Sequence, residues 1–281
     1  MVTEWSIPGS DEFTIHGSTH LPAGDANGVV IIVHGYMGFK EYGMFPWLAS
    51  HICDQGAIVH RINLSHSGME HGQGPFNDDA FRRGTWNAAV EDIVRVVGCV
   101  QEGVLAGQGK GIVLLGHSRG GSSCLLAAGR HGGDSLMQMV CGIVSLSAPA
   151  SLRRFRDDAW ATLESGQPFI LRSNRTGQDL HVDPIWLESQ LADPGGHDLL
   201  AQVGEIIVPM VLIHGSDDAT VSASDAVSLA SANPEGSTVH IIEGADHVFQ
   251  TPNPFPPDAP ASPALQSMWG YVSETLVDWF Q

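Results

Sequence analysis

Positive charge is scarce in this sequence. Its 281 residues include 13 Lys and Arg against 31 Asp and Glu, a formal net charge of −18 at pH 7, and the only lysines are Lys40 and Lys110. Charged residues of both signs make up 16% of the chain, below the ~25% that is usual for globular proteins. Nucleic acids and anionic membranes are bound through basic stripes that neutralise phosphates. The composition therefore predicts neither a nucleic-acid partner nor a membrane partner.

Long apolar runs, secretion signals and paired cysteines are also missing. The longest stretch without a charge, residues 135–152, contains Gln138, Pro149 and several serines, which excludes a bilayer span. The first residues, MVTEWSIPGSDEF, show neither the basic nor the apolar region of a secretory signal. Because the four cysteines form no CxxC pair, we expect reduced thiols in a soluble cytoplasmic protein, without zinc or redox function.

Apolar residues and glycine are abundant. Hydrophobic residues make up 43% of the chain and there are 33 glycines, which is enough to bury a sizeable core. At about 150 residues per domain, the length fits one large domain or one domain with an insertion.

Short apolar runs alternate with helix-period segments along most of the chain. Nearly continuous Val, Ile and Leu is typical of strands that are covered on both faces. The alternation therefore predicts an α/β fold with a mostly parallel central sheet and helices on both faces. Residues 12–21 are expected to add an antiparallel strand before the parallel series. The six parallel strand candidates are residues 28–34, 57–64, 111–117, 140–147, 208–214 and 237–243.

Four segments are predicted helices: residues 85–104, 118–131, 222–233 and 262–280. The first places apolar side chains at i, i+3, i+4 and i+7, the pattern of an amphipathic helix. Ser222 with Asp225 resembles a capping box, and Ser262 before Pro263 resembles an N-cap followed by proline at the first helical position.

Two segments interrupt this alternation. Residues 150–205 show no convincing strand pattern and contain several aromatic residues, so we interpret them as a cap inserted into a core formed by residues 1–149 and 206–281. Residues 251–263 hold six of the 16 prolines, which predicts a stiff, extended connection to the last helix.

The pentapeptide Gly116-His117-Ser118-Arg119-Gly120 has the form G-x-S-x-G and lies between a predicted strand and a predicted helix. That context is typical of a nucleophile elbow, in which glycines flank a serine whose strained backbone exposes Oγ at the helix N-terminus. The alternative is a tight turn whose serine merely caps the helix. A serine nucleophile needs a base such as neutral imidazole, and the base needs a carboxylate to fix its tautomer.

These features resemble the α/β-hydrolase family over nearly the whole chain outside the cap, and in that family serine, acid and histidine follow in this order. Three further stretches carry the resemblance. The VHGYMG run at 33–38 is similar to the His-Gly turn that supplies one oxyanion-hole amide. The HGSDDATV run at 214–221 is similar to the H-G-x-x-D-x-x-V segment bearing the acid, and GADH at 244–247 to the loop bearing the histidine.

Within the family, the chain looks most like bacterial esterases related to dienelactone hydrolases and to cinnamoyl or feruloyl esterases. The run HGYMGFKEYGMFPWLA, the GHSRGG elbow and the NRTGQ run at 174–178 carry this finer likeness. Dienelactone hydrolases proper have cysteine at the elbow, whereas this chain has Ser118. That departure counts against lactone specificity.

The resemblance and the chemistry together assign a role to each of five residues. Ser118 is the nucleophile, His247 is first the base and then the acid, and Asp218 orients the imidazole. The backbone N–H groups of Tyr36 and Arg119 form the oxyanion hole.

Two other carboxylates are alternatives for the orienting acid. Asp217 is adjacent to Asp218, and only one of them can face His247 because consecutive side chains in an extended loop point to different sides. Asp246 is constrained by its position next to the histidine. Position favours Asp218, the third residue after Gly215, as in the H-G-x-x-D segment.

The sequence thus predicts a serine esterase that hydrolyses a small-molecule carboxylic ester through an acyl-enzyme and needs no cofactor. A thioester, lactone, amide or C–C bond would be cleaved by the same three residues. A module that binds a small ligand without catalysis is the alternative from another class, because fold does not guarantee function. The oligomeric state stays open.

Four side chains are candidates for substrate binding, of which three are aromatic or imidazole side chains and the fourth is an arginine. Trp160 and Trp186 of the cap either line an apolar site or belong to the core of the cap. His66 is either a substrate-loop residue or part of a polar loop. With His71 it resembles a metal pair only loosely, because no further spaced ligands accompany the two, so we expect no metal.

The fourth candidate comes from a cluster of arginines in the cap. Arg175 is favoured because it lies in the NRTGQ run and because arginine suits a bidentate carboxylate contact. Two other members, at positions 153 and 154, have aspartates four residues later. They are expected to form solvated helix pairs.

Overall fold

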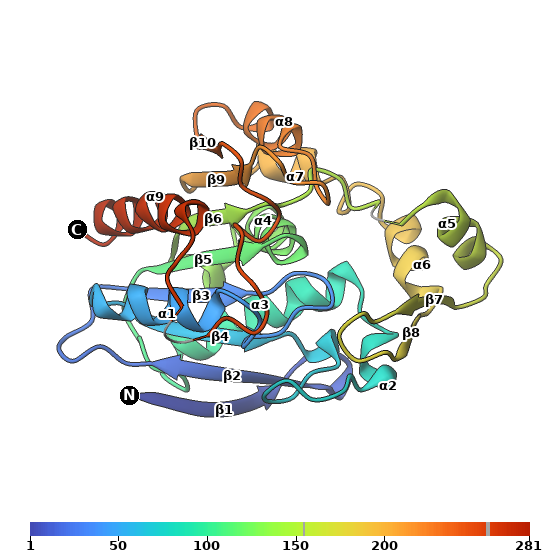
Figure 1. The fold of residues 1–281 in the computed structure, drawn as a ribbon, viewed down its shortest axis with the longest axis horizontal. Coiled ribbons are helices and arrows are strands. Elements are labelled where there is room, and N and C mark those ends of the chain that lie inside the picture. Colours follow the sequence, from blue (N-terminus) through green and yellow to red (C-terminus); the bar gives the residue numbers. More distant parts are fainter. Residues whose placement is uncertain (154, 257–258) are drawn as a thin grey trace.

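The computed structural model describes residues 1–153, 155–256 and 259–281. Its centre is an eight-stranded sheet in the order β1-β2-β4-β3-β5-β6-β9-β10 (Figure 1). From β4 to β10 all neighbouring strands are parallel, whereas β2 is antiparallel to both β1 and β4. The strands are β1 (Val2–Pro8), β2 (Thr14–His20), β3 (Val29–Val33), β4 (Ile58–Asn63), β5 (Ile112–His117), β6 (Val140–Leu146), β9 (Met210–Gly215) and β10 (Ser237–Ile242).

All six predicted parallel strands are confirmed, and the antiparallel strand expected within residues 12–21 is β2. The sequence did not predict β1, which pairs with β2 along its whole length and forms the outer edge of the sheet. Its residues are mostly exposed, with only Ile7 buried. An edge strand with one buried residue lacks the apolar run by which the other strands were found.

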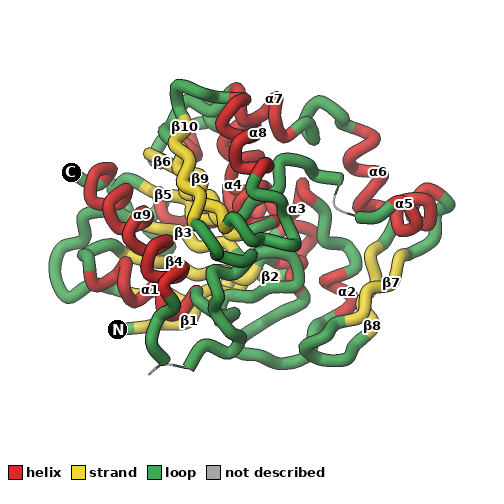
Figure 2. The backbone as a smooth tube through the Cα atoms, turned by 45° about the horizontal axis from the view of Figure 1, so that its top comes forward, coloured by secondary structure: helices red, strands yellow, loops and turns green. Residues whose placement is uncertain are grey.

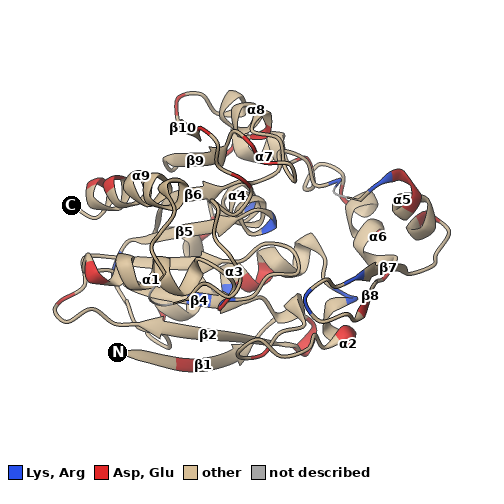
Figure 3. Ribbon diagram, in the orientation of Figure 1, with Lys and Arg blue, Asp and Glu red and all other residues tan. Residues whose placement is uncertain are grey.

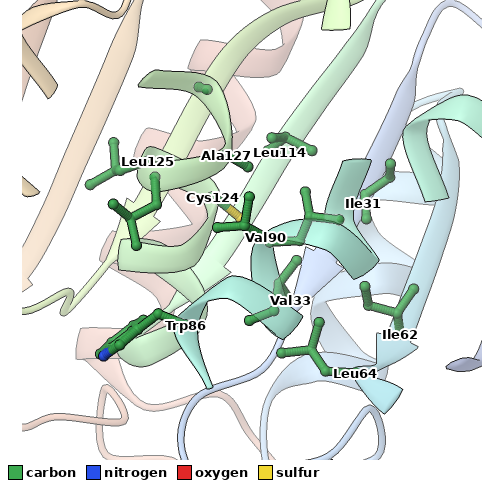
Figure 4. Close-up of a cluster of buried hydrophobic side chains, with 14 of the residues drawn as sticks. Ile31, Val33, Ile62, Leu64, Trp86, Val90, Leu114, Cys124, Leu125 and Ala127 are labelled. Carbon is green, nitrogen blue, oxygen red and sulfur yellow. The ribbon is translucent and has the colours of Figure 1, made fainter. Parts of the chain in front are cut away.

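Helices cover both faces of the sheet because successive strand residues point to opposite sides. In β3, Val29, Ile31 and Val33 belong to one apolar cluster and Val30 and Ile32 to the other. The first cluster packs against α3 (Trp86–Gln101), α4 (Arg119–His131) and α8 (Ser224–Ala232), and Figure 4 shows part of it. The second packs against α1 (Phe45–Asp54) and α9 (Pro263–Trp279), which lie on one side of the sheet in Figure 1 and Figure 2.

Polar caps fix where these helices begin. The Thr85 side chain accepts a hydrogen bond from the Ala88 N–H at the start of α3, and Ser262 accepts one from the Leu265 N–H at the start of α9. The N-cap predicted at Ser262, with Pro263 as the first helical residue, is confirmed.

The capping box predicted for residues 222–225 is wrong. α8 begins at Ser224, and the residue before it, Ala223, makes no side-chain cap. The carboxylate of Asp225 instead accepts a hydrogen bond from the Ala150 N–H (3.1 Å). Asp225 therefore connects α8 to the loop after β6 rather than closing its own helix end.

The chain between β6 and β9, residues 147–209, is called here the inserted segment. It contains α5 (Asp157–Glu164), β7 (Phe169–Arg172), β8 (Asp179–Val182), α6 (Ile185–Ala192) and α7 (Leu199–Gly204). In Figure 1 α5, α6, β7 and β8 stand beside one end of the sheet, while α7 lies next to α8. α7 approaches α4 closely, since a Cβ on Gly129 would lie 2.3 Å from the Gln202 carbonyl oxygen.

Residues 150–205 show no convincing strand pattern in the sequence, yet β7 and β8 form an antiparallel hairpin there. Each strand has four residues and alternates exposed with covered positions, too short a pattern to recognise in the sequence. Arg153 forms the expected pair with Asp157 (2.8 Å). The pair expected of Arg154 lies outside the described residues.

The described part of the proline-rich stretch runs beside α1. The Gly43 N–H donates to Oδ1 of Asn253 (3.0 Å), and the Phe255 ring lies 6.5 Å from the Trp47 ring. No helix in the described part of the chain combines the length and apolar character needed to cross a bilayer.

Candidate active site

Ser118 forms the sharp turn between β5 and α4. Its backbone has φ 53° and ψ −123°, a conformation that residues other than glycine rarely adopt. The turn brings backbones unusually close, since a Cβ on Gly120 would lie 2.3 Å from the Val33 oxygen and one on Gly116 would lie 2.4 Å from the Gly120 oxygen. Only glycine fits at those two positions. The strand, turn and helix expected of a nucleophile elbow are therefore present.

Asp218 follows β9 and its carboxylate is fully buried. Oδ1 accepts hydrogen bonds from the backbone N–H groups of Thr220 and Val221, both at 2.8 Å. Oδ2 accepts one from Nδ1 of His247 at 2.7 Å. The adjacent Asp217 is exposed, and its carboxylate accepts a hydrogen bond from the Ser216 hydroxyl (2.9 Å). Of the two neighbouring aspartates, the structure thus places Asp218 against the histidine.

A second histidine contacts the same carboxylate oxygen. Nε2 of His214 lies 3.1 Å from Oδ2 of Asp218 and 3.0 Å from the Val221 carbonyl oxygen. Both neighbours are acceptors, so this nitrogen carries the hydrogen. Burial alone would raise the pKa of Asp218, but hydrogen bonds from His214, His247 and the Val221 N–H hold it below its usual range. Asp218 is therefore an anion at neutral pH.

His247 lies in the loop after β10, and a neighbouring histidine holds that loop. Nε2 of His117 donates to the His247 carbonyl oxygen (2.8 Å), and the two rings lie 4.8 Å apart. Burial lowers the pKa of His117 to about 3, helped by the nearby His247, so its ring is neutral. The third carboxylate candidate, Asp246, accepts hydrogen bonds from the Val248 and Gln250 N–H groups.

The loop after β3 lies against the elbow, since a Cβ on Gly35 would be 3.0 Å from Cβ of Ser118. His34 holds this loop: Nδ1 donates to the Gly35 oxygen (2.8 Å) and Nε2 accepts from the Leu64 N–H (3.3 Å). Burial lowers the pKa of His34 to about 4, so the ring is neutral, as this pair of bonds requires. The Tyr36 N–H has no acceptor among the described residues.

Arg119 follows Ser118, and its backbone N–H also lacks an acceptor in the described part of the chain. Its side chain turns away, because Nη2 donates to the carbonyl oxygens of Gly84 and Thr85, both at 2.9 Å. The guanidinium lies 5.1 Å from the Tyr36 ring and 4.9 Å from the Trp86 ring. Arg119 therefore connects the elbow to the start of α3.

Two pockets meet at Ser118, and both are also lined by Tyr36 and His247. The first, called here the hairpin pocket, has a volume of about 260 Å³ and includes Arg172 at the end of β7 and three residues of the turn that follows, Ser173, Asn174 and Arg175. The second, called here the aromatic pocket, has a volume of about 280 Å³ and includes Trp86, Arg119, Phe155 and Trp186. A molecule bound at Ser118 therefore has room on two sides.

The structure brings two of the four predicted substrate-binding side chains to these pockets. Arg175 lines the hairpin pocket and Trp186 lines the aromatic pocket. Trp160 lines neither: its Nε1 donates to Glu164 (3.0 Å) and Arg153 stacks on its ring.

His66 lines a separate cavity of only about 30 Å³. It lies in the 3₁₀ turn Ser65–Ser67 and is directed inward, with Nδ1 bonded to the Ala80 oxygen (3.0 Å). His71 instead pairs with Glu4 (2.9 Å). The described residues contain no cluster of three or more His, Cys, Asp or Glu side chains arranged to hold a metal ion.

Several residues of the site were not singled out as site residues from the sequence. Phe155 precedes α5, and Trp86 lies in the segment that was predicted only as an amphipathic helix. His214 carried a signal, because it opens the H-G-x-x-D stretch, but no spacing shows that its side chain turns back to Asp218.

Residues 30–259 match the family described as "Alpha/beta hydrolase family". A curated relative, the monoglyceride lipase of Homo sapiens, is 25% identical over 246 residues, which cover 81% of this chain and 78% of the lipase.

Solved structures show the same fold. Est1E from Butyrivibrio proteoclasticus, in a structure with ferulic acid bound, has a TM-score of 0.71 at 17% identity, with 98% of each chain covered. The alpha/beta hydrolase domain-containing protein 10 from mouse has a TM-score of 0.69 at 15% identity, covering 98% of this chain and 99% of that one. Because the family model matches residues 30–259, well over half of the sequence, the chain belongs to the alpha/beta hydrolase family.

Proposed function

We propose that this protein is a serine esterase that hydrolyses small-molecule carboxylic esters through an acyl-enzyme. The observation that carries the proposal is the 2.7 Å contact between Nδ1 of His247 and the buried Oδ2 of Asp218, in a site where Ser118 and His247 line the same two pockets. Because Nδ1 donates to the carboxylate, Nε2 is left free to accept a proton.

In the first half of the reaction, Ser118 Oγ attacks the ester carbonyl carbon while Nε2 of His247 takes the hydroxyl proton. The negative charge that develops on the carbonyl oxygen is stabilised by the free N–H groups of Tyr36 and Arg119. Asp218 stabilises the imidazolium. The C–O bond of the ester then breaks, and His247 gives its proton to the departing alcohol.

In the second half, a water molecule attacks the acyl-serine. His247 takes a proton from the water and returns it to Ser118 Oγ as the acid leaves. One ester and one water thus give one acid and one alcohol, and the enzyme returns to its starting state. Besides the ester and the water, these steps use side chains and backbone N–H groups of the chain.

The relatives support small esters as substrates. One is named a monoglyceride lipase, and the structure of Est1E from Butyrivibrio proteoclasticus holds ferulic acid. The two pockets are of a size suited to small molecules.

Labelling with a fluorophosphonate probe tests the nucleophile directly. We expect the probe to label the wild-type protein at Ser118 and to leave Ser118→Ala unlabelled. A panel of p-nitrophenyl, aryl, thioester, lactone and amide substrates then identifies the bond, with esters expected to turn over fastest. Folded protein that is not labelled and turns over no substrate would favour a binding module instead.

A cytoplasmic location is part of the same proposal. All four cysteines are free thiols, which fits a reducing compartment.

A further inference from the structure

The hairpin pocket has an unusual charge. The chain contains 31 acidic residues, yet none of the described residues that line this pocket is Asp or Glu, whereas two are Arg. Figure 3 shows how few basic positions the molecule has and that several of them lie on the inserted segment. In a strongly acidic protein, this pocket is locally cationic.

One of the two cations has no acidic partner. Arg172 pairs with Asp179 (2.8 Å). In contrast, Arg175 makes no contact with a carboxylate in the described part of the chain: Nη1 donates to the carbonyl oxygens of Gln73 (2.7 Å) and Gly74 (2.9 Å), and Nη2 contacts Sδ of Met69 (3.3 Å). The positive charge at Arg175 is therefore not neutralised within the described structure.

Two N–H groups of Arg175 remain unused. The buried Nε has no hydrogen-bond partner among the described residues, and Nη2 has a second hydrogen beyond the one that faces Met69. In a guanidinium, Nε–H and one Nη2–H share the edge that binds a carboxylate with two parallel hydrogen bonds. A buried donor without a partner costs free energy.

The guanidinium is also held in place before any ligand binds. It lies between two phenyl rings, 4.9 Å from Phe39 and 4.7 Å from Phe76. The turn that carries it is fixed by Gln178, whose side chain bonds to both the N–H (2.8 Å) and the carbonyl oxygen (3.0 Å) of Phe76. A preorganised cation binds its ligand without the entropic cost of ordering a long side chain.

We infer that the hairpin pocket binds a carboxylate on the substrate, so that the preferred substrate is an ester with one anionic half and one apolar, flat half. The inference rests on the proposed function. Arg175, the arginine of this pocket without an acidic partner among the described residues, would pair with the carboxylate through its guanidinium. The other half would lie in the aromatic pocket between Trp86, Phe155 and Trp186.

Two pairs of substrates test the inference, each pair differing only in a terminal carboxylate or carboxamide. The first pair is mono-4-nitrophenyl adipate and 4-nitrophenyl adipamate, with the charge on the acyl side. The second pair is the phenylacetate ester of 3-hydroxypropanoate and that of 3-hydroxypropanamide, with the charge on the alcohol side. We expect kcat/KM to favour the carboxylate by about 10- to 100-fold in one pair, the range for a charge-assisted hydrogen-bonded contact.

Variants of Arg175 then test whether this residue causes the preference for the carboxylate substrate. In Arg175→Met, the ratio of kcat/KM for the carboxylate substrate to that for the carboxamide substrate is expected to fall to about one. Arg175→Lys should retain only part of the preference, because lysine keeps the charge but cannot form two parallel hydrogen bonds with a carboxylate. The control is Arg95→Met, which removes the same charge from an exposed position on α3 that pairs with Glu91. It should keep the wild-type preference.

The inference is overturned if neither pair shows a preference, or if Arg175→Met keeps it. Fluorophosphonate labelling of Ser118 and circular dichroism show whether each variant is folded. If Arg175→Met does not fold, the wild-type preference and Arg175→Lys decide. A labelled enzyme that hydrolyses charged and neutral esters equally contradicts only the inference, whereas unlabelled Ser118 without turnover contradicts the proposed function itself.

Discussion

At the scale of single residues, Asp218 and Asp217 show how position determines what a carboxylate can do. The two are adjacent, yet one is buried and accepts hydrogen bonds on both oxygens, while the other is exposed. Both histidine contacts of Asp218 converge on the same oxygen. His214 thus helps to hold the carboxylate in the orientation in which it meets Nδ1 of His247.

Replacing each aspartate by asparagine separates the two roles. We expect Asp218→Asn to lower kcat by several orders of magnitude, about 10⁴-fold in a comparable serine protease, because the amide favours the wrong imidazole tautomer. Asp217→Asn should leave kcat within a few fold. Steady-state kinetics on one ester substrate decides the matter, and the reverse ranking of the two variants would refute the assignment.

Sequence spacing predicted which residues meet but not where every side chain points. Strands that end at one edge of a sheet bring their following loops together, which is why Asp218 and His247 could be placed side by side. His66 could not be placed, because a short turn directs it inward to the Ala80 oxygen. Trp160 and Trp186 both stood out in the sequence, and only packing shows that Trp186 alone lines a pocket.

At the scale of elements, the first turn of α9 is connected to the loop of the candidate base. The Ser262 hydroxyl caps α9 by accepting from the Leu265 N–H (3.0 Å), and it donates to the Phe249 carbonyl oxygen (2.8 Å). Phe249 is two residues after His247. One hydroxyl thus stabilises a helix end and holds the loop that carries the histidine.

Two substitutions at Ser262 separate these effects. Ser262→Ala removes both bonds and should lower the free energy of unfolding by about 1 kcal/mol, the usual cost of a lost cap, with a reduced kcat. Ser262→Asp keeps an acceptor for the cap but cannot donate to Phe249, so stability should be largely retained while kcat still falls. Urea unfolding and kinetics on both variants provide the check; unchanged kcat in both would show that this bond does not position the loop.

Buried strands were easier to predict than exposed ones. The six parallel strands are covered on both faces and appear in the sequence as continuous apolar runs. β1 and the β7–β8 hairpin have exposed faces, so their pattern is weak over four to seven residues. The hairpin beneath the pocket was missed for the same reason, although one residue that it carries into the pocket, Arg175, was predicted to bind substrate.

At the scale of the whole molecule, buried neutral histidines make the fold sensitive to acid. Burial is the main cause that lowers the pKa of His20, His34 and His60 to about 4, and of His117 to about 3. The reference pKa of histidine in an unfolded chain is ~6.5. Below that pH the unfolded chain takes up protons that the folded chain does not, so stability falls as the pH decreases.

We expect the free energy of unfolding to drop between pH 6.5 and pH 5, with a slope that approaches about 1.4 kcal/mol per pH unit for each such histidine. His60→Gln should reduce the slope of the free energy of unfolding against pH by about the contribution of one histidine. The same change at His131, whose side chain is 36% exposed, is the control. Urea titrations at several pH values measure the slope, and a slope equal in wild type and His60→Gln would contradict the expectation.

Two pockets meet at Ser118, and different parts of the chain provide the candidate reacting residues and much of the pocket lining. The serine, the histidine and the acid lie in loops at the ends of β5, β10 and β9, whereas the inserted segment provides Arg172 and Arg175 to one pocket and Phe155 and Trp186 to the other. Under the proposed function, changes in that one stretch would alter which esters fit without altering the residues proposed to react. Such a division allows selectivity to diverge between relatives while the chemistry is inherited unchanged.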